Sequence, residues 1–239
     1  MALPRATYRL QLHREFDFDA AARLAPYLAR LGVSHVYSSP CLKARPGSRH
    51  GYDIVAHDEV NPELGGDAAL ARLVAALRDA GLGHLVDVVP NHMGVWGTDN
   101  RLWLDVLAWG EESRYAGWFD IDWDPDRRYL QDKLLAPILA DQYGFELEAG
   151  HLQLRFDESC GELAVWCYDA HRLPICPLHY ETILGDEHYG LQELGDDFSA
   201  LPEWRPQMAQ RSVELQRQLA DLVAADPAAR AALQSALHR

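Results

Sequence analysis

The chain has 239 residues, enough for one large domain or two small ones, because domains most often span about 100–150 residues. Hydrophobic residues make up 48% and charged residues 24%, which is typical of a folded globular chain and excludes a disordered one. The net charge of −14 opposes binding to nucleic-acid phosphates and to anionic membrane surfaces, so neither is expected as a partner.

Two further features predict a cytoplasmic protein. The segment MALPRATYRLQLHREF carries charge throughout and lacks the apolar core of a secretory signal, and no later run approaches the ~20 apolar residues of a membrane span. The 4 cysteines, in a chain of this size without a leader, are expected to be reduced thiols.

The first part of the chain begins with a strand pattern and then a helix pattern. Residues 7–12 alternate polar and apolar side chains as a strand does. Asp19 then opens an amphipathic helix whose leucines recur at helical spacing until Gly32. Pro26 lies inside this helix, so a bend is expected there.

The same alternation continues to Pro90. Residues 33–38 predict a second strand, and residues 67–80 predict a second amphipathic helix, closed by Gly81. The apolar run 85–89 suits a strand that is buried on both faces. Strands alternating with helices imply right-handed βαβ units and a parallel sheet, either doubly wound or part of a (β/α)₈ barrel.

The alternation ends after Pro90. Residues 94–126 are dense in Trp, Asp and Gly, and residues 152–168 predict a β-hairpin around the turn DESCG. The segment 206–239 is strongly helical, and Asp226 and Pro227 divide it into two helices.

Two motifs lie at the predicted carboxyl ends of strands, where α/β folds place their sites. DVVPNH, residues 87–92, ends an apolar strand in Asp, Asn and His. The long loop 39–66 contains RHGYD, residues 49–53, in which an aromatic ring stands beside a carboxylate, a combination that suits a sugar. The plain alternatives are a capped strand end and an ordinary long loop.

Several segments follow one another in a familiar order: TYRLQL, GVSHVYSSP, LKARPGSRHGYDI, NPELGG, DVVPNHM and WFDIDWDP. In this order, from about residue 7 to residue 180, the chain resembles the amino-terminal part of the maltooligosyl trehalose synthases, a branch of the α-amylase family of glycoside hydrolases. DVVPNH resembles a region that the whole family shares. ARPGS followed by HGYD, together with FDIDW, is narrower and resembles the trehalose-forming branch.

The resemblance implies the first three strands and helices of a catalytic (β/α)₈ barrel over residues 1–92. Residues 93–239 would then be an inserted domain B, a β-hairpin plus helices, with a helical tail. Because a full barrel needs ~250 residues before any insertion, the remainder of the barrel is expected to be absent. The family's catalytic carboxylates follow its fourth, fifth and seventh strands. No segment matches them, so no catalytic residue is expected within this chain, which alone should be inactive.

The resemblance also implies substrate-binding roles. Tyr52 would stack on the glucose at subsite −1, and His92 would hydrogen-bond the hydroxyls of that glucose. Asp87 and Asn91 would line the site without acting as nucleophile or acid. The remaining substrate-binding candidates come from the same loop as Tyr52: Arg49, His50 and Asp53.

The activity implied for the complete enzyme is isomerisation. It would convert the reducing-end α-1,4 linkage of a maltooligosaccharide into an α,α-1,1 linkage by a retaining intramolecular transglucosylation, without a cofactor. Some family members that take a terminal glucose have Asp where this chain has Arg49, a difference that fits action at the reducing end. The alternatives are a non-catalytic glucan-binding fragment, a fragment completed by a C-terminal chain, and a different α-amylase-family hydrolase or transglycosylase.

Two other clusters could suggest a metal, but no metal is expected. The alternating acids of FDIDWDPD have Pro125 and Gln131 where a calcium loop needs Gly and Glu. The second cluster has no C-x₂-C pair, as a zinc site would. It comprises Cys160, Cys167, Cys176 and His179. Most tryptophans of residues 96–123 are interpreted as core of the inserted domain.

Overall fold

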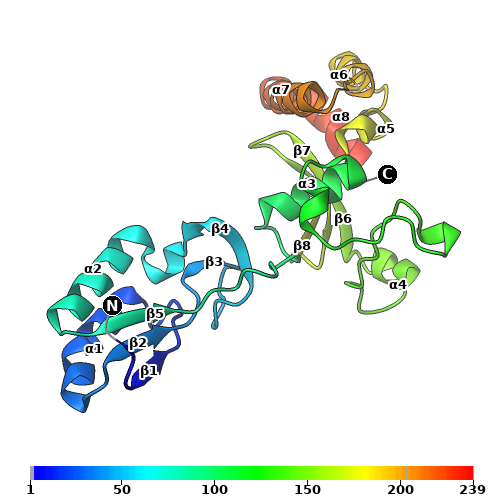
Figure 1. The fold of residues 1–239 in the computed structure, drawn as a ribbon. Coiled ribbons are helices and arrows are strands. Elements are labelled where there is room, and N and C mark those ends of the chain that lie inside the picture. The colour runs from blue at the N-terminus through cyan, green and yellow to red at the C-terminus, as the bar shows by residue number, and fades with distance from the viewer. Residues whose placement is uncertain (1–2, 203, 239) are drawn as a thin grey trace. The chain divides into compact units, whose positions relative to one another are not determined.

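A computed structural model describes residues 3–202 and 204–238 (Figure 1). The chain divides into two compact units, Met1–Asn100 and Arg101–Arg239. The domain boundary predicted after residue 92 lies within the first of these units. In the described ranges, no helix is both long enough and apolar enough to cross a membrane.

The first unit is built on a three-stranded parallel sheet. Its strands are β1 (Thr7–Leu10), β2 (His35–Ser38) and β5 (Gly83–Val86), in the order β1-β2-β5. Both strand pairs are parallel and in continuous register, with Arg9 opposite Tyr37 and Tyr37 opposite Leu85. The predicted parallel sheet with intervening helices is confirmed.

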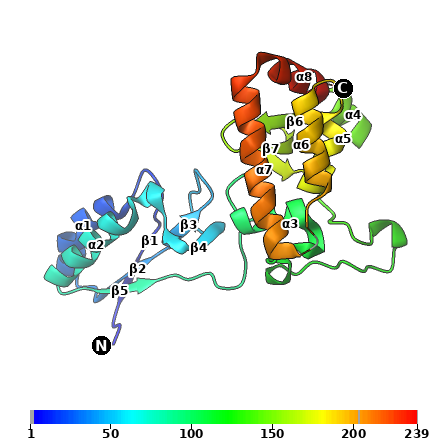
Figure 2. The ribbon, with the colours of Figure 1, turned by 90° about the horizontal axis from the view of Figure 1, so that it is seen from above.

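Two helices cover one face of this sheet. Helix α1 (Phe18–Leu31) and helix α2 (Gly66–Asp79) lie side by side (Figures 1 and 2). Their apolar stripes form a core with Leu10 and Val36 from the helix-facing side of the sheet. The opposite side of the same strands carries Arg9 and Tyr37 and is therefore free to build a polar site.

Two predictions for this unit are wrong in detail. Asp17, not Asp19, caps α1: its carboxylate accepts from the backbone N–H of Ala20 at 2.8 Å. The strand predicted at residues 85–89 is not buried on both faces, since Leu85, Val86 and Val88 are 36%, 46% and 62% exposed. The reason is that α1 and α2 cover only one face of the sheet and that β5 is an edge strand, with β2 on one side and no further strand beside it among the described residues.

The long loop after β2 contains an antiparallel hairpin that sequence analysis did not predict. Strand β3 (Leu42–Ala44) pairs with β4 (Ile54–Val60), and the register shifts twice along the pair. The segment between them holds the RHGYD motif, so a short sheet supports a motif that would otherwise lie on an unsupported loop.

The second unit contains an antiparallel sheet of β6 (Leu152–Asp157), β7 (Glu162–Cys167) and β8 (His171–Pro174). The predicted hairpin corresponds to β6 and β7, and β8 extends it by a strand that was not predicted. Before the sheet come α3 (Arg101–Trp109) and the short α4 (Tyr143–Glu148).

Four helices follow the sheet and share its core. They are α5 (Tyr180–Leu184), α6 (Tyr189–Ser199), α7 (Arg205–Ala225) and α8 (Pro227–Leu237). Asp226 caps α8 through the N–H of Ala228 at 2.8 Å, so the predicted division of the tail is confirmed. Short 3₁₀ helices lie in the connections of both units: Pro62–Leu64, Gly110–Glu112, Ala116–Trp118, Arg128–Leu130 and Pro177–His179.

The tryptophans depart from expectation, whereas the cysteines are free thiols as predicted. Of the tryptophans at residues 96–123, Trp103 is buried and Trp118 is 69% exposed, while the others are half-buried, so their interpretation as mostly core is wrong. All four cysteines are free; Cys41 and Cys167 are buried, whereas Cys160 is exposed.

Candidate functional site

Strand register brings polar side chains together at the carboxyl end of the parallel sheet. Arg9, Tyr37 and Leu85 lie side by side on the face that the helices do not cover. Asp87 lies two residues after Leu85 and so projects to the same face. Its backbone N–H donates to Ser38 O at 3.0 Å, which holds the chain in place just beyond the end of β5.

The carboxylate of Asp87 is the centre of a hydrogen-bond network. Its Oδ2 atom accepts from the hydroxyl of Tyr52 at 2.5 Å and from the hydroxyl of Tyr37 at 2.8 Å. These two hydroxyl donors, Tyr52 first, lower the pKa of Asp87, and the same bond to Asp87 raises the pKa of Tyr37. The group is therefore an ionised acceptor that receives hydrogen bonds from two phenol hydroxyls.

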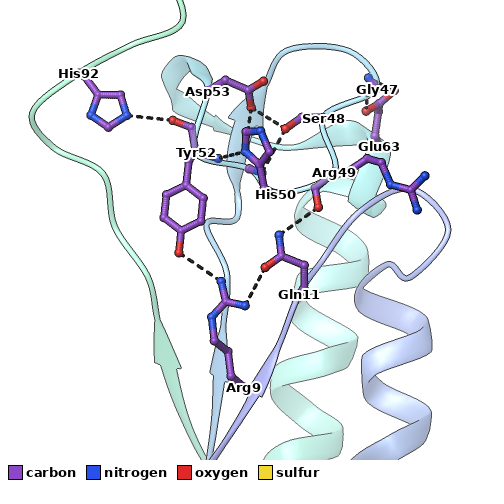
Figure 3. A network of polar contacts seen from close by, with 11 residues as sticks. Arg9, Gln11, Gly47, Ser48, Arg49, His50, Tyr52, Asp53, Glu63 and His92 are labelled. Atoms are coloured by element: carbon purple, nitrogen blue, oxygen red, sulfur yellow. Dashed lines mark hydrogen bonds and ion pairs between the residues drawn. The ribbon is translucent and has the colours of Figure 1, made fainter.

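Arg9 extends this network toward the loop (Figure 3). One guanidinium nitrogen donates to the Tyr52 hydroxyl at 3.2 Å and the other to Gln11 Oε1 at 2.7 Å. Gln11 in turn donates to the backbone carbonyl of Arg49 at 2.9 Å. The bond to Tyr52 raises the pKa of Arg9, whose positive charge complements the charge of Asp87. The Tyr52 ring is thus fixed through its hydroxyl from two sides.

The DVVPNH motif is tied to the hairpin strand that follows Tyr52. His57 Nε2 donates to Val89 O at 2.9 Å, His92 Nε2 donates to Tyr52 O at 3.1 Å, and Gly94 N donates to Ile54 O at 2.8 Å. The other ring nitrogen of His92 lies 3.1 Å from Asn91 Oδ1. The two motifs, distant in sequence, therefore form one surface on which Tyr52 and His92 are exposed or half-buried.

The remaining loop candidates shape the turn that presents Tyr52. Asp53 Oδ1 accepts from Ser48 Oγ at 2.5 Å and lies 3.7 Å from His50 Nδ1, which also accepts from the backbone N–H of Tyr52. Gly51 adopts φ +77°, and a Cβ there would lie 2.8 Å from Pro40 O. The sharp turn thus needs glycine directly before Tyr52.

Arg49 points away from this network. Its side chain is 76% exposed, and one nitrogen lies 3.6 Å from Glu15 on the β1–α1 connection. Of the residues that sequence analysis proposed, Tyr52 and Asp87 contact each other directly, His92 joins through the Tyr52 carbonyl, and Asn91 joins through His92. Only the backbone of Arg49 takes part, through Gln11.

Three members of the site, Arg9, Gln11 and Tyr37, were not predicted. Side chains alternate between the two faces of a strand, and this alternation could have predicted them. Arg9 and Gln11, two residues apart, point to the same side, and Tyr37 lies opposite Arg9 on the neighbouring strand. Polar residues on the face opposite the apolar stripe are normally predicted to be solvent-exposed, so the strand pattern alone does not assign these three residues to a site.

The site can bind a neutral polar ligand with an apolar face. It combines a fixed aromatic ring with an ionised acceptor, an imidazole and a carboxamide, which is the set of groups that a sugar ring uses. Among the described residues, no three His, Cys, Asp or Glu side chains come together as ligands for a metal ion.

The chain belongs to the α-amylase family. Residues 20–147, more than half of the chain, match the family model described as alpha amylase, catalytic domain. This match supports an α/β fold of the TIM-barrel type for the amino-terminal portion.

Three similar proteins are named as maltooligosyl trehalose synthases, which form one branch of this family. A putative maltooligosyl trehalose synthase of Mycobacterium tuberculosis is 50% identical over 131 residues, which are 52% of this chain and 17% of that protein. The structure of maltooligosyltrehalose synthase from Arthrobacter ramosus is 45% identical with a TM-score of 0.62, covering 72% of this chain and 21% of that one. A hypothetical maltooligosyl trehalose synthase from Sulfolobus tokodaii is 35% identical with a TM-score of 0.61, covering 76% and 23%.

The chain is thus similar to the amino-terminal part of maltooligosyl trehalose synthases, and it spans about a fifth of the length of these relatives.

Proposed function

We propose that this chain forms one wall of the glucan-binding site of an enzyme that converts the reducing-end α-1,4 linkage of maltooligosaccharides into an α,α-1,1 linkage. The observation that carries the proposal is the Tyr52 ring, fixed by Asp87 and Arg9 at the carboxyl end of the parallel sheet. The family membership and the likeness to maltooligosyl trehalose synthases support the choice of substrate.

Each side chain of the site has a distinct task in this proposal. Tyr52 stacks on the glucose at subsite −1, and Asn91 lines the site. His92 hydrogen-bonds the glucose hydroxyls by exchanging its contact with the Tyr52 carbonyl or with Asn91 for one with the sugar. Asp87 is a positioning group, because its Oδ2 atom already accepts two phenolic hydrogen bonds and is poorly placed to attack a sugar. Asp53 and His50 hold the turn that presents Tyr52, and Arg49 lies at the outer edge of the loop.

The proposed mechanism is that of a retaining glycosidase. One carboxylate attacks the anomeric carbon to form a covalent glycosyl-enzyme, while a second, about 5–5.5 Å away, protonates the departing glucose. The retained glucose then attacks through its own anomeric hydroxyl and returns the proton to the acid/base, so the net reaction is isomerisation. Excluding water matters, because an oriented acceptor can reach an effective molarity of ~10⁵ M or more. Both catalytic carboxylates are proposed to lie outside this chain.

The proposed organisation follows from the same reasoning. Residues 1–92 would supply the first strands of the barrel, and residues 93–239 would be domain B with its helical tail, in a cytoplasmic enzyme without cofactor. β5 is an edge strand, and its last residue Val86 and the following Val88 are 46% and 62% exposed, which favours pairing with further polypeptide. The second candidate is therefore that a separate C-terminal chain binds these 239 residues and completes the enzyme.

Incubating the purified chain with maltopentaose and following reducing ends tests this division of labour. We expect no loss of reducing ends with the chain alone, because the carboxylates that carry the chemistry are missing. A complete maltooligosyl trehalose synthase assayed in parallel serves as the positive control. Measurable conversion by the chain alone would overturn the proposal that catalysis lies elsewhere.

A further inference from the structure

The outer face of the β6–β7–β8 sheet carries side chains that the site in the first unit does not use. The register places Gln153, Trp166 and Arg172 in one row across the three strands. The other face of β7 carries Leu163, which is fully buried in the core of the second unit. The row therefore lies on the face turned away from that core, and its central Trp166 is only half-buried.

Two hollows meet at this row of side chains, and the second also reaches the core of the second unit through Tyr180. One, of about 270 Å³, is lined by Trp166 and Arg155, and the other, of about 330 Å³, is lined by Trp109 where α3 and α7 border the sheet. Glu162 and Arg172 line both hollows. The two hollows are thus neighbours that share one ion pair and have a tryptophan each; together they are called here the β-sheet groove.

The charges that line the β-sheet groove nearly balance. Three guanidinium groups, Arg101, Arg155 and Arg172, stand against four carboxylates, Asp105, Asp157, Glu158 and Glu162, a net charge of −1. Arg172 forms an ion pair with Glu162, and Arg155 forms one with Asp169. The groove therefore offers little net charge to an ion. Its chemistry favours a neutral ligand that can use both donors and acceptors.

The two indole rings are held in place by guanidinium groups. The Arg155 guanidinium carbon lies 5.3 Å from the centroid of the Trp166 ring, and that of Arg205 lies 3.9 Å from the centroid of the Trp109 ring. Gln216 lines the hollow near Trp109 and donates to the Tyr180 hydroxyl at 3.2 Å. A flat ring beside fixed polar groups suits the apolar face and the hydroxyls of a pyranose.

We propose that the β-sheet groove is a second glucan-binding site, separate from the Tyr52 network and without a catalytic role. The Trp166 ring stacks on one glucose of an α-1,4 chain, and the Arg172–Glu162 pair hydrogen-bonds its hydroxyls. The choice of an α-glucan rests on the proposed function, whereas the neutral, sugar-like chemistry rests on the groove itself. Such a site raises the local concentration of glucan near the enzyme.

Titration of the 239-residue chain with maltoheptaose, followed by calorimetry, tests the proposal. Replacing Trp166 by Ala should weaken binding about 10-fold, within the range of roughly 5- to 150-fold that stacking of a flat ring on an aromatic side chain contributes. Trp166→Phe keeps a smaller ring and should weaken binding less. Trp118→Ala, at a 69% exposed tryptophan outside the groove, is the matched control and should bind as the unmodified chain does.

A second readout does not depend on any variant folding. In the unmodified chain, maltoheptaose should shift the indole N–H resonances of Trp166 and Trp109 and leave that of Trp118 unchanged. If neither groove resonance moves at saturating sugar, or if Trp166→Ala binds as tightly as the unmodified chain, the groove is not a glucan site. Tyr52→Ala separates the two proposals, because Tyr52 does not line the groove. In a chain that carries Tyr52→Ala, maltoheptaose should still bind the groove, and adding Trp166→Ala should still weaken that binding.

Discussion

Replacing Tyr52 by Ala in a complete enzyme that contains this chain is expected to lower kcat/KM for maltopentaose about 100-fold. The change removes both the ring proposed to stack on the glucose and the hydroxyl that bonds Asp87 at 2.5 Å. Loss of a positioning contact next to the reacting bond can cost a factor of this size, because the reactive geometry requires atoms to be placed within about 1 Å. Initial rates measured by loss of reducing ends give the value.

A graded series shows which part of Tyr52 matters. Tyr52→Phe keeps the ring and removes only the hydroxyl, so we expect a loss of about 10-fold, and Asp87→Ala should resemble it because the same hydrogen bond disappears. Tyr27→Ala, on an exposed position of α1, is the control for removing a tyrosine and should leave kcat/KM unchanged. Kinetics of Tyr52→Ala equal to those of the unmodified enzyme would refute the placement of Tyr52 at the sugar.

Replacing Gly161 by Ala is expected to lower the free energy of unfolding of the second unit by about 3 kcal/mol or more. Gly161 lies in the turn between β6 and β7 with φ +76°, and a Cβ there would lie 1.7 Å from the backbone oxygen of Gln216 on α7. The sheet and α7 would have to separate to admit the methyl group. Urea unfolding followed by circular dichroism measures the change.

Gly150 provides a matched control for this substitution. Its φ of +74° is nearly that of Gly161, but a Cβ there would meet no atom within 4 Å. Gly150→Ala therefore adds only the strain of a left-handed backbone, about 1 kcal/mol. Equal destabilisation by the two substitutions would contradict the close approach of α7 to the turn.

The regular elements of the fold could be predicted from local patterns. Leucines at helical spacing located α1 and α2, and Asp226 before Pro227 located the break between α7 and α8. Elements whose formation depends on distant partners could not be predicted. Strand β3 has three residues and exists because β4 pairs with it, and β8 exists because it completes the edge of β7.

The candidate site could be predicted only for residues with a motif around them. Tyr52 and His92 stand in short sequence motifs, and the structure brings these two residues together through the Tyr52 carbonyl. Arg9 and Tyr37 have no such motif, and they contact Asp87 or Tyr52 only because of strand register. The apolar run of β5 also predicts burial on both faces, which requires packed layers on both faces of the sheet, whereas α1 and α2 cover only one.

The central claim is that Tyr52 contacts the glucan, and the crystal structure of a complete enzyme containing this chain with maltopentaose bound tests it most directly. We predict that one glucose ring lies within about 4 Å of the Tyr52 ring. His92 or Asn91 should lie within about 3.2 Å of its hydroxyl oxygens. A glucan that occupies the catalytic site without touching Tyr52 would contradict the claim.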